Sequence, residues 1–156
     1  MTRKRGLAAS VVAIVLGMAA ILIVIRRSET LPTGPVDVVW NHTLCAECRM
    51  SVGERAYAAQ LQTRDGRVLD FDDPGCLFRY EDDNPVEVHA VYFHHVREDR
   101  WLAEAEAGFV FSGPSPMGYD LGAVTAGDTG ALSPERAREK VLHPAGDPAR
   151  RNDDAH

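Results

Sequence analysis

The chain has few cysteines, and this excludes one class of small extracellular protein. Of its 156 residues only three are cysteine, Cys45, Cys48 and Cys76. Three cysteines form one disulfide at most, which is too few for a disulfide-built scaffold. In an oxidising compartment at least one thiol would stay unpaired, and it would need either burial or a chemical use.

The sequence also lacks the common signatures of enzymes. It has no assignable Ser-His-Asp arrangement, phosphate-cradling glycine loop or carboxylate pair. No repeat is strong enough to indicate an array. We therefore expect a binding protein and not an enzyme.

Basic residues are scarce outside the N-terminal region. Without the five at positions 3, 4, 5, 26 and 27, 12 Lys and Arg face 23 Asp and Glu, a formal charge of −11. Such an acidic surface repels nucleic acid, which we do not expect as a partner, and it favours solubility or cationic partners.

One apolar run is long enough to cross a bilayer. Residues 7–25 contain no charged side chain, and as a helix they would span about 28 Å. Three basic residues precede the run and two follow it. We expect residues 1–6 in the cytoplasm and the domain outside it, in the periplasm or at the cell surface. No small-x-small cleavage site follows the run, so we predict an uncleaved single-pass anchor.

The rest of the chain predicts one small α+β domain. We assign residues 26–37 to a linker, because their prolines and glycine resist regular structure. Residues 38–142 form the predicted domain, and they contain both tryptophans, all four tyrosines and all five phenylalanines. Residues 143–156 are rich in Pro, Arg and Asp and form a predicted disordered tail.

Within the domain the pattern is mostly strand. The Asp65-Gly66 pair is a strong hairpin signal, and Asp73 and Ser133 can each cap a helix that begins with proline. Residues 120–142 offer one helix and no convincing strand. The expected strands are 56–62, 67–71, 86–96, 101–107 and 109–112, with the last two forming a pair, and the expected helices are 74–80 and 134–142.

Soft sulfur ligands are concentrated in one short segment. Cys45, Cys48 and Met50 lie within six residues of one another. Thiolate and thioether sulfur favour Cu(I) over hard cations. On an extended backbone the Met50 sulfur can project to the same side as the Cys48 sulfur. The segment predicts a Cu(I) site with Cys48 and Met50 as its principal ligands.

Three other residues are candidates for the same site. Met117 lies between Pro116 and Gly118 in an expected loop, an unusual place for a core methionine, so it is a candidate third ligand or lid. Cys45 is a further candidate ligand. Cys76 falls in the first turn of its helix, where the macrodipole favours a thiolate. The alternative for Cys76 is simple burial in the core.

A Cys-x-x-Cys pair also has other uses. Cys45 and Cys48 could form the couple of a thiol–disulfide oxidoreductase, or hold zinc in a structural or interaction module with Cys76 and a histidine. No spacing fixes a four-ligand zinc set, and His94 and His95 point to opposite faces of one expected strand. Both alternatives stay open.

The order of these motifs resembles the NosL family of copper-binding accessory proteins for nitrous oxide reductase. The match covers roughly residues 44 to 124. The matching residues are Cys48-Arg49-Met50, Gln60, Phe71-Asp72-Asp73, Cys76 to Tyr80, Ala90-Val91-Tyr92, Trp101, Ala105, Ala107 and Pro116-Met117-Gly118.

The resemblance implies a fold, a cargo and a partner. The fold would be α+β with two related ββαβ halves, shared with part of organomercurial lyase, and the second half is shortened here. Cys48 and Met50 would be Cu(I) ligands. The protein would be a copper chaperone that delivers Cu(I) by ligand exchange to a copper-accepting protein, such as nitrous oxide reductase or one of its assembly factors. Family members are commonly lipid-anchored, whereas this chain is predicted to use a helix.

Overall fold

The computed structural model describes residues 14–21 and 31–144. The chain divides into two compact units, Met1–Leu31 and Pro32–His156. Residues 14–21 of the first unit are helical. Among the described residues, no helix is both long and apolar enough to cross a membrane. Most of the predicted anchor and almost all of the predicted tail lie outside the described residues, so both stay predictions.

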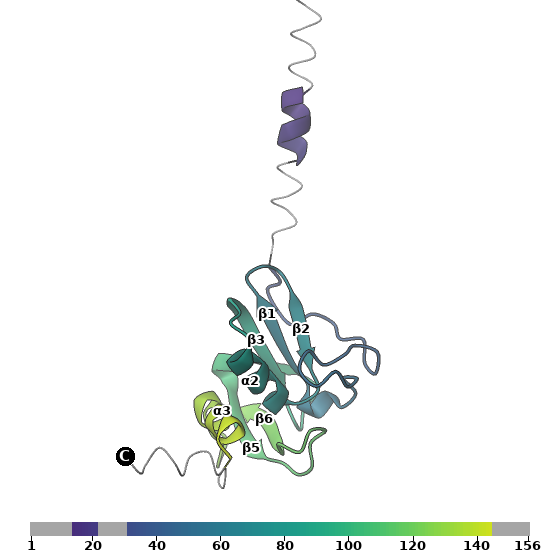
Figure 1. Ribbon diagram of the computed structural model, residues 1–156. Coiled ribbons are helices and arrows are strands. Elements are labelled where there is room, and N and C mark those ends of the chain that lie inside the picture. Colours follow the sequence, from purple (N-terminus) through teal and green to yellow (C-terminus); the bar gives the residue numbers. More distant parts are fainter. Residues whose placement is uncertain (1–13, 22–30, 145–156) are drawn as a thin grey trace, which may run out of the picture. The chain divides into compact units, whose positions relative to one another are not determined.

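The second unit is a mixed α+β domain with two antiparallel sheets (Figure 1). The order β1-β2-α2-β3 is a ββαβ unit, and β5-β6-α3 follows as ββα. The elements are η1 (Arg55–Tyr57), β1 (Ala59–Thr63), β2 (Val68–Phe71), α2 (Pro74–Asp83), β3 (Val88–His94), β4 (Trp101–Ala103), η2 (Glu104–Glu106), β5 (Ala107–Phe111), β6 (Leu121–Thr125) and α3 (Pro134–Leu142).

Local signals correctly predicted the first hairpin and the start of both helices. Strands β1 and β2 form the expected hairpin, and Gly66 adopts a φ of 87°, a conformation that glycine reaches without strain. Both helices begin at the expected proline, after the Asp73 and Ser133 caps. Helix α2 continues to Asp83, beyond the expected end at residue 80. Residues 55–57 form η1 instead of the start of β1.

Two predictions about the second half are wrong. The expected strand 101–107 breaks at η2, so β4 pairs with β3 in the sheet of order β2-β1-β3-β4, and β5 pairs with β6 in a second sheet. Strand β6 lies in the segment that offered no strand. Its Gly122 faces Val96 and Ser112, where an added Cβ would stand 2.6 and 2.5 Å from their side chains. Only glycine fits at position 122 without displacing these side chains. Because glycine is unfavourable in strands, it obscured the sequence pattern of β6.

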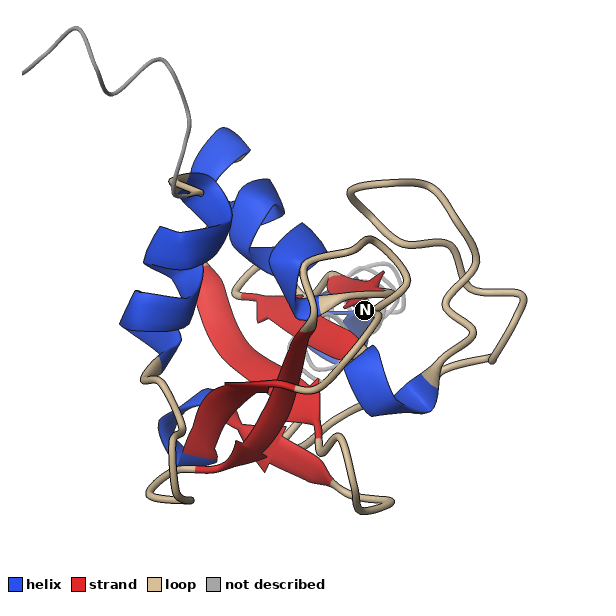
Figure 2. Cartoon of the chain, turned by 90° about the horizontal axis from the view of Figure 1, so that it is seen from below, coloured by secondary structure: helices blue, strands red, loops and turns tan. Residues whose placement is uncertain are grey.

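An aromatic cluster joins the two sheets to α2. Phe78 of α2, Phe93 of β3 and Phe109 of β5 are fully buried. Their ring centroids lie 4.9 to 5.7 Å apart, in tilted and edge-to-face arrangements typical of favourable aromatic pairs. Helices α2 and α3 pack against each other on one side of the strands (Figure 2).

Part of the predicted linker is fastened to the sheet. The Gln60 side chain accepts a hydrogen bond from the Val36 N–H at 2.8 Å and donates one to the Val36 carbonyl at 3.0 Å. The Gln62 amide donates to the Gly34 carbonyl at 2.8 Å. These bonds satisfy the Gln60 amide and the Gln62 amino group, as buried polar groups require, whereas the buried Gln62 Oε1 has no hydrogen-bond partner among the described residues.

Candidate metal centre

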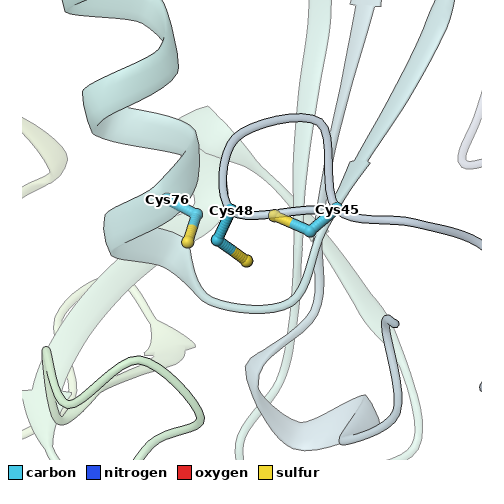
Figure 3. Close-up of side chains that lie close together, drawn as sticks. All are labelled: Cys45, Cys48 and Cys76. Carbon is cyan, nitrogen blue, oxygen red and sulfur yellow. The ribbon is translucent and has the colours of Figure 1, made fainter. Parts of the chain in front are cut away.

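Three cysteines from two distant segments lie together in the folded chain (Figure 3). Cys45 and Cys48 come from the turn before η1, and Cys76 comes from the first turn of α2. Their three sulfur atoms lie within 4.8 Å of one another. Cys45 is 0% exposed and Cys76 is 1% exposed, whereas Cys48 is partly exposed. One cysteine of the cluster is therefore partly exposed and two are buried.

A tight turn positions the first two sulfurs. The Cys45 N–H donates to the Met50 carbonyl at 2.8 Å, which closes the turn. The next residue, Ala46, donates its N–H to the Asp70 carbonyl at the end of β2, at 2.9 Å. The turn is thus attached to the sheet, and its sulfurs are held by backbone bonds and not by side-chain packing alone.

The cap of α2 positions the third sulfur. The Asp73 carboxylate accepts the Gly75 N–H at 2.9 Å, and the Asp73 carbonyl accepts the Cys76 N–H at 3.0 Å. Cys76 therefore lies in the first turn, at the positive end of the helix dipole, as the sequence predicted. Its burial is observed, as the alternative interpretation expected. The neighbouring thiols and burial raise the pKa of Cys76 against the effect of the dipole, and its role as a ligand stays a prediction.

The three thiols influence one another's protonation. A hydrogen bond from Cys76, with backbone donors, lowers the pKa of Cys45 by stabilising its thiolate against the cost of burial. The same hydrogen bond raises the pKa of Cys76, as do its burial and the negative charge on Cys45. Burial, with that charge, raises the pKa of Cys48. The cluster thus loses one proton readily and keeps the others, and a bound cation would have to displace them.

The expected geometry between Cys48 and Met50 is wrong. Arg49 adopts a φ of 66°, in the left-handed region, so the backbone between the two residues turns instead of extending. Met50 is 52% exposed beside the cluster's turn. Its role as a ligand stays a prediction, without the support that an extended backbone would have provided.

The Met117 loop is fastened to the same helix cap. Asp73 Oδ2 accepts the Ser115 hydroxyl at 2.5 Å and the Met117 N–H at 3.2 Å. Met117 is 36% exposed. The structure thus attaches this loop to the turn of α2 that carries Cys76, and a ligand or lid role for Met117 stays a prediction.

Sequence patterns missed one neighbour of the centre. The Tyr119 ring packs directly on Gly75, where a Cβ would stand 2.2 Å from ring carbons. No motif signals this contact, because it joins two segments through tertiary packing. Tyr119 therefore covers the backbone immediately before Cys76.

Within the described part of the chain, no histidine joins the cysteines. Across residues 14–21 and 31–144, the three cysteines are the one group of His, Cys, Asp or Glu side chains arranged to hold a metal ion. His94 lies elsewhere, with its Nε2 3.2 Å from Asp99 Oδ1 and its ring edge-on to Trp101. The described residues therefore do not assemble a four-ligand Cys₃His zinc site.

Comparison with known proteins returns one distant match. No protein-family profile and no curated protein matches the chain. One solved structure is similar to it, the copper chaperone NosL from Shewanella denitrificans, at 19% identity and a TM-score of 0.48. The match covers 71% of this chain and 87% of that one. At this level of likeness no functional residue is transferred from that protein.

The buried Asp73 carboxyl group should make the stability of the domain depend on pH. Burial raises its pKa, although bonds from Ser115, Gly75 and Met117 oppose the rise. The folded chain then keeps this proton at a pH where the unfolded chain has lost it, so stability is gained as pH falls through the raised pKa and lost as pH rises. We expect the stability advantage of the parent over Asp73→Asn to grow between about pH 7.5 and about pH 4.5.

Urea unfolding of both proteins at each pH measures this advantage. The thiols are unchanged in the variant, so their own titration cancels in the comparison. An advantage that is constant or shrinks as pH falls would contradict a raised pKa for Asp73.

Proposed function

We propose that this protein carries Cu(I) and passes it to a copper-accepting protein by ligand exchange. The observation that carries the proposal is the cluster of three cysteine sulfurs within 4.8 Å. Thiolates are soft ligands that select Cu(I) over Mg²⁺, Ca²⁺ and Mn²⁺. Three of them around one ion supply a complete donor set from the domain itself.

The exposure of the sulfurs supports a carrier over a permanent metal site. Cys45 and Cys76 are covered, and Cys48 is reachable from outside. A Cys, Met or His of an accepting protein can approach the ion on the Cys48 side and replace ligands one at a time. Met50, exposed on the same turn, is the proposed thioether ligand on that side.

The same exposure argues against a thiol–disulfide oxidoreductase. An attacking cysteine must be both ionised and accessible. Cys45 has the lowered pKa but is fully buried, whereas the accessible Cys48 has a raised pKa. Neither thiol combines the two properties.

Membrane attachment and the recipient complete the proposal. The apolar run 7–25 supports a helical anchor with the domain outside the cytoplasm. The motif order that resembles the NosL family supports nitrous oxide reductase, or one of its assembly factors, as the recipient.

A Cu(I) competition titration tests the proposed cargo. The full-length chain, kept reduced, should take one Cu(I) from a chromophoric chelator. Cys48→Ser should weaken binding at least about tenfold, about 1.4 kcal/mol, because it removes a soft donor. Met50→Leu should weaken it if the thioether is a ligand. Leu44→Ala, an exposed residue on the same turn with no donor atom, should not.

The outcomes separate the candidate functions. If Cys48→Ser and Met50→Leu both left the affinity within about twofold of the parent, the proposed site would be wrong. Cys45→Ser should leave the metal-free chain folded by circular dichroism. Unfolding on removal of zinc would instead indicate a structural zinc module.

A further inference from the structure

We propose that the centre also reduces Cu(II), with the Cys45 and Cys76 thiols as electron donors and Cys48 as the thiolate that keeps the Cu(I) formed. The inference rests on the proposed function, because it concerns the oxidation state in which the cargo arrives. The starting observation is that the covered pair of sulfurs is distinct from the accessible one.

The reaction balances without another reactant. Two Cu(II) ions and two thiols yield two Cu(I) ions, one disulfide and two protons. Each thiol gives up one electron and its proton, each copper ion gains one electron, and the S–S bond is the one bond formed between heavy atoms.

The separation of the two sulfur atoms is compatible with this bond. The sulfur atoms of Cys45 and Cys76 lie within 4.8 Å of each other. A disulfide is about 2.05 Å long, so closure requires the two sulfurs to approach by less than about 3 Å. The two cysteines sit on separate segments, the turn attached to β2 and the first turn of α2.

Burial of Cys45 and Cys76 favours a disulfide within one chain over a disulfide between two chains. At 0% and 1% exposure, Cys45 and Cys76 cannot meet a cysteine of a second chain. The disulfide they form is therefore intramolecular. Cys48 is the sulfur that an arriving ion meets first, and it connects the ion to the covered pair, because all three sulfurs are mutual neighbours.

The proposal gives each cysteine a separate task. Two thiols are consumed as electron donors, and the remaining thiol, beside Met50, still offers a soft donor to Cu(I). A centre with only Cys45 and Cys48 would lose all of its thiolates on giving up two electrons.

The experiment uses the full-length reduced chain without oxygen. Copper(II) sulfate is added with bicinchoninate to report Cu(I), and free thiols and protein mass are measured. We expect about two Cu(I) per chain, two thiols lost and a monomer about 2 Da lighter. Digestion after Glu47 separates Cys45 from Cys48, so peptide mapping should identify a bond between Cys45 and Cys76.

Variants assign the roles. Cys48→Ser keeps the covered pair, so it should still yield about two Cu(I) per chain but hold Cu(I) more weakly. The double variant Cys45→Ser, Cys76→Ser keeps one thiol, so it should form covalent dimers. A disulfide that contains Cys48, dimers of the parent, or a yield below about one Cu(I) per chain would overturn the inference.

Titration of the reduced chain with Cu(I) distinguishes the two proposals. Normal Cu(I) binding together with failed Cu(II) reduction overturns this inference alone. Loss of Cu(I) binding by the reduced parent overturns the proposed function as well.

Discussion

Replacing Phe109 with alanine should destabilise the domain by about 3–5 kcal/mol, enough to unfold a large fraction of a domain of ordinary stability. Phe109 is fully buried, and its ring lies 4.9 Å from that of Phe93 and 5.4 Å from that of Phe78. Truncation leaves a cavity between strands of both sheets and α2. The free energy of unfolding follows from urea titration monitored by circular dichroism.

Phe111 is the matched control. It lies two residues further along the same strand and is 65% exposed. Phe111→Ala removes the same atoms from the surface, and the free energy of unfolding should change by about 0.5 kcal/mol or less. Equal losses for the two variants would show that the aromatic cluster does not hold the sheets together.

Adding one methyl group at Gly75 should destabilise the domain by about 2 kcal/mol and weaken Cu(I) binding. The new Cβ would stand 2.2 Å from the Tyr119 ring. Either the ring or the start of α2 must move, and Cys76 is the next residue. The measurements are urea unfolding and the Cu(I) competition titration.

A double-mutant cycle measures the steric clash between the methyl group added at position 75 and the Tyr119 ring. Adding Tyr119→Ala to Gly75→Ala removes the ring that the methyl group meets, so the two changes should be non-additive by about 1 kcal/mol or more. Gly34→Ala is the control, because no atom of the described chain lies within 4 Å of its added Cβ and its φ is not positive. Additive effects of the first pair would mean that the ring moves aside freely.

Signals carried by neighbouring residues were predictable. The Asp65-Gly66 hairpin and the capped, proline-initiated helices each depend on a few consecutive residues, and all of them form. The missed strand β6 depends on distant packing, since Gly122 is required by Val96 and Ser112. The pairing of β4 with β3, and of β5 with β6, likewise depends on tertiary contacts.

The candidate site was also predictable only in part. The soft ligands were visible in the sequence, but the arrival of Cys76 beside Cys45 and Cys48 depends on how α2 packs against the turn. The backbone turn before Met50 was also not predictable, because Arg49 is an unusual residue type for a left-handed conformation.

The contact between Gln60 and the segment that enters the domain requires a particular side chain at position 60 but not at position 36. In this contact the Gln60 side chain bonds to the main-chain N–H and carbonyl of Val36, a pair of groups that every amino acid except proline supplies. The contact therefore requires a side-chain amide at position 60, whereas most amino acids at position 36 can make it. Mutational tolerance should differ sharply between two residues that share the same pair of hydrogen bonds.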